Sequence, residues 1–148
     1  LESHRVGVLA TANESGEPHA AAVYMTYDDQ LNIYFMTKKQ TRKSQNLERN
    51  NHAAIVVYDA DLQTTVQAEG TVGEVDNASL QMRVYEEIRQ AAALTSLNTT
   101  PPIAQLMAGG YVTYRLVASS LRMATYSSPD TGMGQVEDIF TVVYPQPY

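Results

Sequence analysis

The feature that most constrains this chain is a series of short segments in which apolar and polar residues alternate, with clusters of turn-forming residues between them. A period of two places successive side chains on opposite faces of a strand, whereas a helix repeats about every 3.6 residues. The first three such segments are residues 5–12, 19–27 and 31–37, with a turn cluster at Asn13–Pro18 and a tight connection at 28–30. This order predicts three consecutive antiparallel strands joined as a meander.

Four later segments also have the pattern of strands. They are residues 53–58, 64–75, 111–126 and 139–144. The apolar run at 53–58 is typical of a strand covered on both faces, and Gly70 and Gly73 predict a bend or bulge of the kind that barrel closure requires. The sequence has no internal repeat and no second composition regime. We therefore expect one α+β, mainly β barrel domain over residues 1–148, with six or seven strands and two or three helices.

Two segments carry helical signals. Residues 41–49 form the first predicted helix, and Thr41 is suited to cap its first turn. Asp76 is placed to cap a second helix that runs to about residue 93. Apolar side chains recur every four residues along it and predict a core-facing stripe at Leu80, Val84 and Ile88. A short further helical turn that ends at Met107 is also expected.

Charge is distributed unevenly along the chain. The formal net charge of −6 argues against a protein that binds nucleic acid or an anionic membrane, since both need a broad basic surface. Half of the basic residues, including every lysine, nevertheless lie in one short stretch: Lys38, Lys39, Arg42, Lys43 and Arg49. One interpretation is a solvated helix face. The other is a phosphate site formed by Thr41, Arg42 and Lys43, because a predicted helix N-terminus lies there and its free N–H groups favour anions.

Several classes of site are excluded by what the sequence lacks. Without cysteine there are no disulfides, thiol nucleophiles, iron–sulfur clusters or cysteine-containing zinc sites. The three histidines show no metal-ligand spacing, and no glycine-rich nucleotide loop is complete. No apolar run is long enough to span a bilayer, and the first residues do not have the pattern of a secretory signal, so we expect a cytoplasmic protein.

Four segments carry a more specific signal. They are VGVLATANESGEPHAAAVYM in the first hairpin, LNIYFMT in the third strand, TRKSQNLERNNHAAIVV in the helix and fourth strand, and TVQAEGTVGEV in the fifth strand. Together they resemble the FMN-binding split β-barrels related to pyridoxamine 5′-phosphate oxidase, closely over residues 4–75 and loosely beyond. The resemblance implies an antiparallel split barrel that binds FMN at a homodimer interface.

The resemblance also implies which residues contact the cofactor. Those that match the phosphate-binding motif of the family are Thr37, Thr41, Arg42 and Lys43, which coincides with the site predicted from charge. The flavin-contacting strand of the family, which uses mainly backbone groups, corresponds to Ala22, Val23, Tyr24 and Met25. A polar side chain of the fifth strand near the ring corresponds to Thr65 or Gln67, and the partner subunit contributes C-terminal residues such as Arg122.

The chain departs from the family at two positions that bear on the reaction. Pyridoxamine-phosphate oxidases proper carry basic residues where this chain has Ala20 and Met25, so oxidation of a B6 vitamer is not expected. The resemblance implies an FMN-dependent oxidoreductase that exchanges electrons with a small-molecule donor or acceptor and needs no catalytic base. The alternative is a carrier or sensor that binds a flavin without turnover. Deazaflavin F420 and haem are the alternative cofactors, since members of the superfamily use both.

Overall fold

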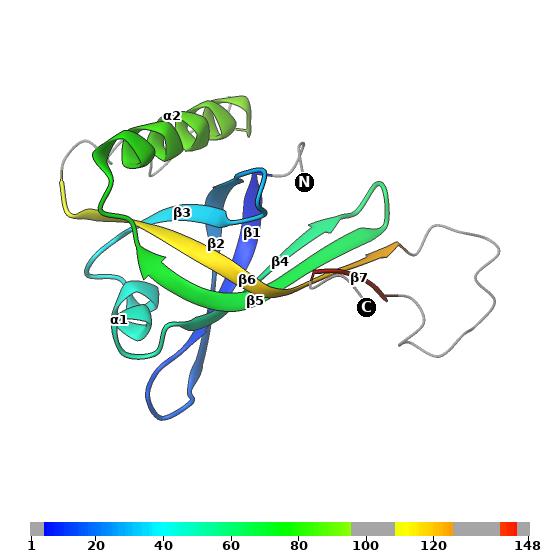
Figure 1. Ribbon diagram of the computed structural model, residues 1–148, viewed down its shortest axis with the longest axis horizontal. Helices are drawn as coiled ribbons and strands as arrows, with labels where there is room; N and C mark the ends of the chain where they lie inside the picture. The colour runs from blue at the N-terminus through cyan, green and yellow to red at the C-terminus, as the bar shows by residue number, and fades with distance from the viewer. Residues whose placement is uncertain (1–4, 96–108, 126–139, 145–148) are drawn as a thin grey trace.

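A computed structural model of the chain describes residues 5–95, 109–125 and 140–144 (Figure 1). Within these ranges the strands are β1 (Val6–Ala12), β2 (Pro18–Tyr27), β3 (Ile33–Lys38), β4 (His52–Asp59), β5 (Thr64–Glu74), β6 (Tyr111–Thr125) and β7 (Phe140–Tyr144), and the helices are α1 (Arg42–Arg49) and α2 (Ala78–Thr95). The bounds of these elements agree with the predicted ones to within a residue or two.

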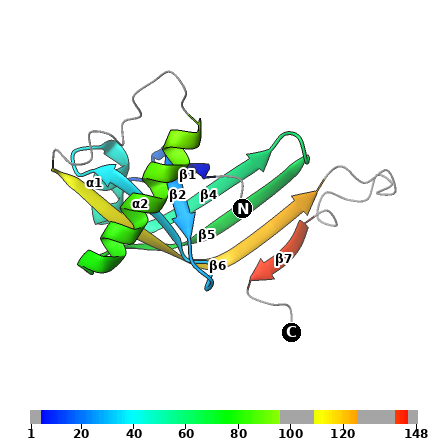
Figure 2. The same cartoon turned by 90° about the horizontal axis from the view of Figure 1, so that it is seen from above.

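The strands form an antiparallel sheet that closes into a barrel. The order across the sheet is β3-β2-β1-β4-β5-β6, and the first half of β6 closes it by pairing with β3, from Tyr111 opposite Lys38 to Leu116 opposite Ile33. The second half of β6 pairs with β7, which extends the sheet beyond the barrel (Figure 2). For the described residues, a closed six-stranded barrel with one further strand and two helices confirms the predicted fold class.

A glycine on β5 allows the barrel to close against β6. The register between these two strands shifts between Glu69 and Gly70, which confirms the predicted bulge. A Cβ atom at Gly70 would lie 2.0 Å from the backbone oxygen of Val117, whereas one at Gly73 would meet nothing within 4 Å. Close packing therefore requires glycine at Gly70 but not at Gly73.

Alternation along the strands builds the core of the barrel. Four inward-facing residues stand opposite one another on neighbouring strands and are buried: Leu9, Ile55, Ala68 and Leu121. The rings of Phe35 and Tyr114 belong to the same cluster and stack with 5.5 Å between their centroids. The burial of these apolar groups is the main contribution to folding.

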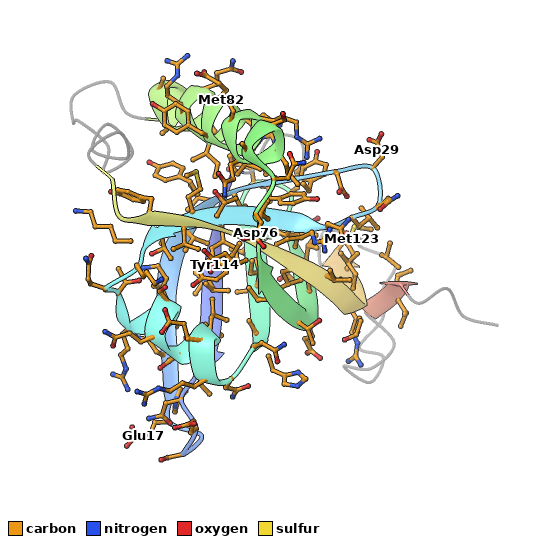
Figure 3. The ribbon with its side chains drawn as sticks, turned by 60° about the vertical axis from the view of Figure 1, so that its left-hand side comes forward. Glu17, Asp29, Asp76, Met82, Tyr114 and Met123 are labelled. Carbon is orange, nitrogen blue, oxygen red and sulfur yellow. The ribbon has the colours of Figure 1, made fainter. Side chains whose placement is uncertain are left out.

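Helix α2 lies over the barrel on the side of β2 and β3 (Figures 1 and 2). Its predicted stripe faces the barrel: Val84 and Ile88 are buried and Leu80 is partly buried, in a second hydrophobic cluster that includes Tyr34. Met82 lies on the opposite face of the helix and points away from the barrel (Figure 3). The amphipathic pattern thus correctly predicted which face of α2 is covered.

The cap of α2 differs from the predicted one. The backbone N–H of Leu80 donates to Oδ1 of Asn77 at 2.9 Å, so Asn77 rather than Asp76 caps the helix. Both residue types are good N-caps, and sequence preference does not separate two such neighbours. The predicted helical turn that ends at Met107 lies outside the described residues.

Candidate functional site

Two threonines join the end of β3 to the start of α1. Thr41 is the N-cap of α1: its ψ of 151° is extended, and its Oγ1 accepts from the backbone N–H of Ser44 at 3.4 Å. The same hydroxyl donates to the backbone oxygen of Lys38 at 2.8 Å and lies 3.1 Å from the hydroxyl of Thr37. In the first turn of a helix, the backbone N–H groups have no partner within the helix, which here applies to Arg42 and Lys43.

Buried polar contacts hold α1 against the barrel. The Ser44 hydroxyl lies 2.9 Å from the phenol oxygen of Tyr114, and Nδ2 of Asn46 donates to Oγ1 of Thr11 at 3.1 Å. All four side chains are buried, and Tyr114 lies inside the barrel in Figure 3. Burial raises the pKa of the Tyr114 phenol, which keeps it protonated at neutral pH. Because such bonds are costly to break in a low dielectric, the start of α1 has a fixed position.

A cavity of about 280 Å³ lies beside the start of α1, between β2 and β3. These two strands pair only from Met25 opposite Phe35 to Tyr27 opposite Ile33, and they diverge beyond that point. The cavity lies where they diverge. Its lining residues are Ala22, Val23, Tyr24, Met36, Thr37, Lys38, Thr41, Lys43, Ile88 and Tyr111.

The lining has two chemically different parts. The polar side of the cavity, next to α1, consists of Thr37, Lys38, Thr41 and Lys43. The apolar side, next to α2, consists of Tyr24, Met36, Ile88 and Tyr111, which all belong to or pack against the second hydrophobic cluster. A ligand with an anionic group and a flat apolar body would match both sides.

The polar side of the cavity carries two ammonium groups, those of Lys38 and Lys43. Within the residues that the structure describes, no carboxylate oxygen lies within 4.0 Å of either ammonium group. Lys38 places its ammonium 5.7 Å from the centre of the Tyr111 ring. Lys43 is partly buried, and burial lowers the pKa of its ammonium from the usual 10.5. A partly desolvated cation without a counter-ion is unfavourable until an anion binds.

β2 presents backbone groups to the same cavity. The backbone N–H of Met25 donates to the backbone oxygen of Arg5 at 2.8 Å, on the side of β1. Successive residues of a strand point their N–H and C=O groups toward opposite edges. Those of Ala22 and Tyr24 therefore point away from β1, toward the edge from which β3 has diverged. This edge offers donors and acceptors to polar atoms at the rim of a flat ligand.

Six of the predicted cofactor-binding residues line this cavity: Ala22, Val23, Tyr24, Thr37, Thr41 and Lys43. Met25 is instead 1% exposed and belongs to the core of the barrel. Arg42 lines a separate polar groove with Glu17 and Glu48. Successive residues of a helix are about 100° apart around its axis, so Arg42 and Lys43 face different surroundings. The side chains of Met25 and Arg42 therefore do not line the cavity.

The remaining predicted residues lie elsewhere on the sheet. Thr65 is buried, and its hydroxyl donates to the backbone oxygen of Val57 at 3.3 Å. Gln67 on β5 stands directly opposite Arg122 on β6. Thr65, Gln67 and Arg122 do not line the cavity of their own protomer.

The sequence patterns did not predict four of the lining residues: Met36, Lys38, Ile88 and Tyr111. Lys38 belongs to the basic cluster of the sequence, and this clustering of charge was sufficient to predict it as a phosphate-binding residue. Ile88 was predicted only as a packing residue, but it packs in the second cluster and lines the cavity at once. Tyr111 reaches the cavity through the pairing of β6 with β3, which no local pattern signals.

The described ranges of the chain hold neither a cluster of metal ligands nor a membrane-spanning helix. No group of three or more His, Asp or Glu side chains is placed there to hold a metal ion. None of the helices described is both long enough and apolar enough to cross a membrane.

Comparison with curated proteins finds relatives over part of the chain. A pyridoxine/pyridoxamine 5′-phosphate oxidase from Crocosphaera subtropica is 36% identical over 70 residues, which are 47% of this chain and 33% of that protein. One from Paraburkholderia phymatum is 39% identical over 64 residues, which are 43% of this chain and 30% of that protein. The match therefore covers less than half of the length of these relatives.

Solved structures with the same fold cover most of the chain. A conserved hypothetical protein from Mycobacterium tuberculosis has a TM-score of 0.69 at 25% identity, covering 91% of this chain and 88% of that one. A pyridoxamine 5′-phosphate oxidase-related, FMN-binding protein from Nostoc punctiforme has a TM-score of 0.60 at 13% identity, with coverages of 84% and 77%. A haem storage protein from Vibrio cholerae (TM-score 0.63, 15% identity, coverages 81% and 86%) and an F420 reductase (0.62, 20%, coverages 78% and 87%) share the fold as well.

The family model described as pyridoxamine 5′-phosphate oxidase matches residues 1–108, which is well over half of the chain. This match includes β1 to β5, both described helices and all the lining residues of the cavity except Tyr111. The chain belongs to the pyridoxamine 5′-phosphate oxidase family, as the resemblance of its first half predicted.

Proposed function

We propose that this chain binds FMN in the cavity between β2 and β3 and acts as an FMN-dependent oxidoreductase. The observation that carries the proposal is Lys43, which is partly buried beside the N-terminus of α1 and has no acidic partner among the described residues. The phosphate of FMN supplies the anion that this ammonium lacks. The free backbone N–H groups of Arg42 and Lys43 add donors aligned with the helix dipole. Lys38 and the hydroxyls of Thr37 and Thr41 complete the proposed phosphate site.

The apolar side of the cavity suits the rest of the cofactor. The isoalloxazine ring is flat and largely apolar, and its polar edge can bond to the backbone groups of Ala22 and Tyr24. The cavity volume of about 280 Å³ is small for a ligand of this size, since pockets that enclose drug-sized ligands measure about 300–1,000 Å³. Part of the cofactor must then be covered by something other than this protomer.

In this proposal the bound FMN supplies hydride or electron transfer, and the protein supplies position, electrostatics and exclusion of water. Oxidation of a B6 vitamer is not proposed. At the two positions where oxidases proper carry basic residues, this chain has the exposed methyl group of Ala20 and the fully buried side chain of Met25. Neither side chain can hold the phosphate of such a substrate.

We also propose a homodimer whose interface is one outer row of side chains. Six residues stand opposite one another on β2, β1, β4, β5, β6 and β7, in the order Ala22, Val8, Val56, Gln67, Arg122 and Val142. Directly opposed residues project from the same face of a sheet, so this outer row is continuous. Its centre is apolar and exposed, at 43% for Val8 and 37% for Val56, as is typical of an interaction surface.

A two-fold axis near the centre of the outer row would complete the cavity. In an isologous interface, each end of such a row meets the opposite end of the same row in the partner subunit. Ala22 lines the cavity at one end, and Gln67 and Arg122 lie toward the other. The dimer would then carry Gln67 of the partner subunit and Arg122 of the partner subunit to the cofactor. In this proposed arrangement, C-terminal residues contact the ring across the interface.

The alternative cofactors are deazaflavin F420 and haem, because an F420 reductase and a haem storage protein share the fold. The described histidines, His19 and His52, do not line the cavity, which favours a flavin because haem iron commonly takes a histidine ligand. F420 resembles FMN in its flat ring and its phosphate, so it remains the closer competitor. None of the described residues that line the cavity is a carboxylate or a histidine, and a carrier or sensor without turnover needs neither.

An absorption spectrum of freshly purified protein, followed by mass identification of the released cofactor, tests the binding proposal. We expect the flavin bands near the visible blue region and the mass of FMN. If the released cofactor were F420 or haem, the proposed site would stand and the identity of the cofactor would change. A colourless protein that does not take up added FMN would contradict the proposal.

Stopped-flow reduction by NADH or NADPH separates the enzyme from the carrier. For an oxidoreductase we expect one of these donors to bleach the bound flavin, followed by reoxidation when an acceptor is added. Bound flavin that neither donor reduces would favour the carrier or sensor. That result would leave the proposal of a flavin-binding site standing.

A further inference from the structure

Helix α2 is joined to the barrel by polar contacts as well as by its apolar stripe. The guanidinium of Arg5 donates to the hydroxyl of Thr26 at 2.9 Å, and this hydroxyl donates to the carboxylate of Glu87 on α2. Arg83, one turn earlier on the helix, lies 3.7 Å from the same carboxylate. Thr26 is 1% exposed, so its hydroxyl is shielded from water, whereas the Glu87 side chain is partly exposed. We name these four residues, Arg5, Thr26, Glu87 and Arg83, the polar latch.

The polar latch continues into the turn between β2 and β3. The guanidinium of Arg83 lies 5.6 Å from the centre of the Tyr34 ring, and the Tyr34 phenol donates to the carboxylate of Asp28 at 2.8 Å. Burial, together with that carboxylate, raises the pKa of Tyr34. Burial also acts to raise the pKa of Asp28, but its hydrogen bonds together outweigh burial and lower it. Tyr34 therefore stays protonated and Asp28 stays ionised around neutral pH.

The residue that follows Glu87 lines the cavity. Ile88 is 2% exposed and forms part of the apolar side. Tyr24, Met36 and Tyr111 line the same side and pack against the cluster that holds α2. The wall of the cavity and the contact between α2 and the barrel are thus formed by the same side chains.

α2 lies at the edge of the molecule, and its main contacts are with β2 and β3 (Figure 3). Elements with few contacts open locally at a lower free energy than the core. For such an element, the loss of one hydrogen bond to a charged group substantially weakens its attachment to the rest of the protein. The polar latch therefore acts on the cavity by stabilising the docked position of α2.

We propose that Glu87 is a positioning residue for the cofactor. Through Thr26 it holds α2 in the docked position, in which Ile88 completes the apolar side of the cavity. Flavin binding and the docking of α2 then stabilise each other, because such coupling is reciprocal. This inference rests on the proposed function, since its ligand is a flavin.

Three variants on α2 isolate the polar latch. Glu87→Ala removes the acceptor of the Thr26 hydroxyl. Glu86→Ala is the matched control, because it removes the same charge from the neighbouring residue, which pairs with Arg89 on the same helix at 3.0 Å. Glu87→Gln retains an oxygen that can accept from Thr26, so it is expected to rescue most of the effect.

Hydrogen exchange of the ligand-free protein measures the docking of α2. We expect the α2 amides of Glu87→Ala to exchange roughly tenfold faster than those of wild type. Those of Glu86→Ala and Glu87→Gln should stay close to wild type, and added FMN should restore protection in Glu87→Ala. Strand amides of the barrel should be unaffected in every variant.

Fluorescence titrations with FMN and with riboflavin measure the effect on binding. If the docked fraction falls to about one third in Glu87→Ala, the apparent Kd rises about threefold. The factor should be the same for both ligands, because α2 covers the apolar side and not the phosphate. Lys43→Ala should weaken FMN and leave riboflavin unchanged.

The outcomes separate this inference from the proposed function. If the wild type bound both flavins while Glu87→Ala matched Glu86→Ala in exchange and affinity, the positioning role would be overturned alone. The positioning role would also be overturned if Glu87→Ala weakened the binding of FMN but not that of riboflavin. The substitution would then act on the phosphate and not on the apolar side of the cavity. A wild type that bound neither flavin would overturn the proposed function.

Discussion

Lys43 brings a positive charge to a partly buried position beside the N-terminus of α1, where the helix dipole is positive as well. In the ligand-free protein this position lowers the pKa of the ammonium and opposes folding. A bound phosphate reverses the balance, because it is attracted by the ammonium and by the free N–H groups together. One side chain therefore links the binding of an anion to the stability of the protein.

The first prediction at this scale concerns the charge of Lys43. Lys43→Ala should weaken FMN by about 1.5–3 kcal/mol, which is roughly 10- to 100-fold in Kd, because one charge-assisted contact to phosphate is lost. Arg49→Ala is the control: Arg49 lies on the same helix but forms an exposed ion pair with Glu14 at 3.8 Å. Titration of flavin fluorescence gives both values. Equal affinities for the two variants would place the phosphate elsewhere.

The second prediction concerns pH. Lys43 binds phosphate as the ammonium, and its pKa in the ligand-free protein is lowered from 10.5. The phosphate is already a dianion just above neutral pH. FMN affinity should therefore be constant from there up to the pKa of Lys43, and should fall as the pH rises through that pKa. The guanidinium of Lys43→Arg stays charged, so this variant should lose the part of the fall that Lys43 causes. Identical alkaline profiles for wild type and Lys43→Arg would contradict the assignment.

At the scale of elements, local patterns in the sequence were sufficient for most of the fold. Alternation over short segments and one four-residue repeat placed the described strands and helices to within a residue or two. The direction of Arg42 could not be predicted in the same way, because the orientation of a short helix depends on its contacts with the barrel. Here the buried bonds of Ser44 and Asn46 set that orientation. The neighbours Arg42 and Lys43 then face different surroundings.

The bulge on β5 gives a prediction at this scale. Gly70→Ala should destabilise the protein by about 1–3 kcal/mol, because its Cβ would meet a backbone oxygen that cannot move alone. Gly73→Ala, three residues along the same strand, should be neutral or slightly stabilising, since it has open space and restricts the unfolded chain. Chemical denaturation of both variants measures the difference. Equal free energies of unfolding would show that β5 and β6 do not approach so closely.

At the scale of the whole molecule, barrel closure creates the cavity. The pairing of β6 with β3 brings Tyr111 beside Lys38, and the packing of α2 adds Ile88. These contacts join segments far apart in the chain, so the sequence could predict the polar side from its basic cluster but not the apolar side. The family resemblance further predicted that the backbone of β2 contacts the cofactor. The proposed contacts of Gln67 and Arg122 depend on a second copy and remain predictions.

The dimer gives the prediction at this scale. Val8→Glu should shift the protein from dimer to monomer, because it places two carboxylates near the centre of the proposed interface. Met82→Glu is the control: Met82 is 59% exposed on the outer face of α2 and should leave the dimer intact. Sedimentation equilibrium over a dilution series, with circular dichroism to check folding, measures the result. A wild type that binds cofactor as a monomer would contradict the shared site.

We propose that the polar side of the cavity holds the phosphate of a flavin. The most direct measurement is the affinity of the wild-type protein for FMN and for riboflavin, which differ only in that phosphate, by fluorescence titration in the same buffer. FMN should bind at least about tenfold more tightly, since at least one charge-assisted contact is gained. Equal affinities, or no binding of either flavin, would contradict the claim.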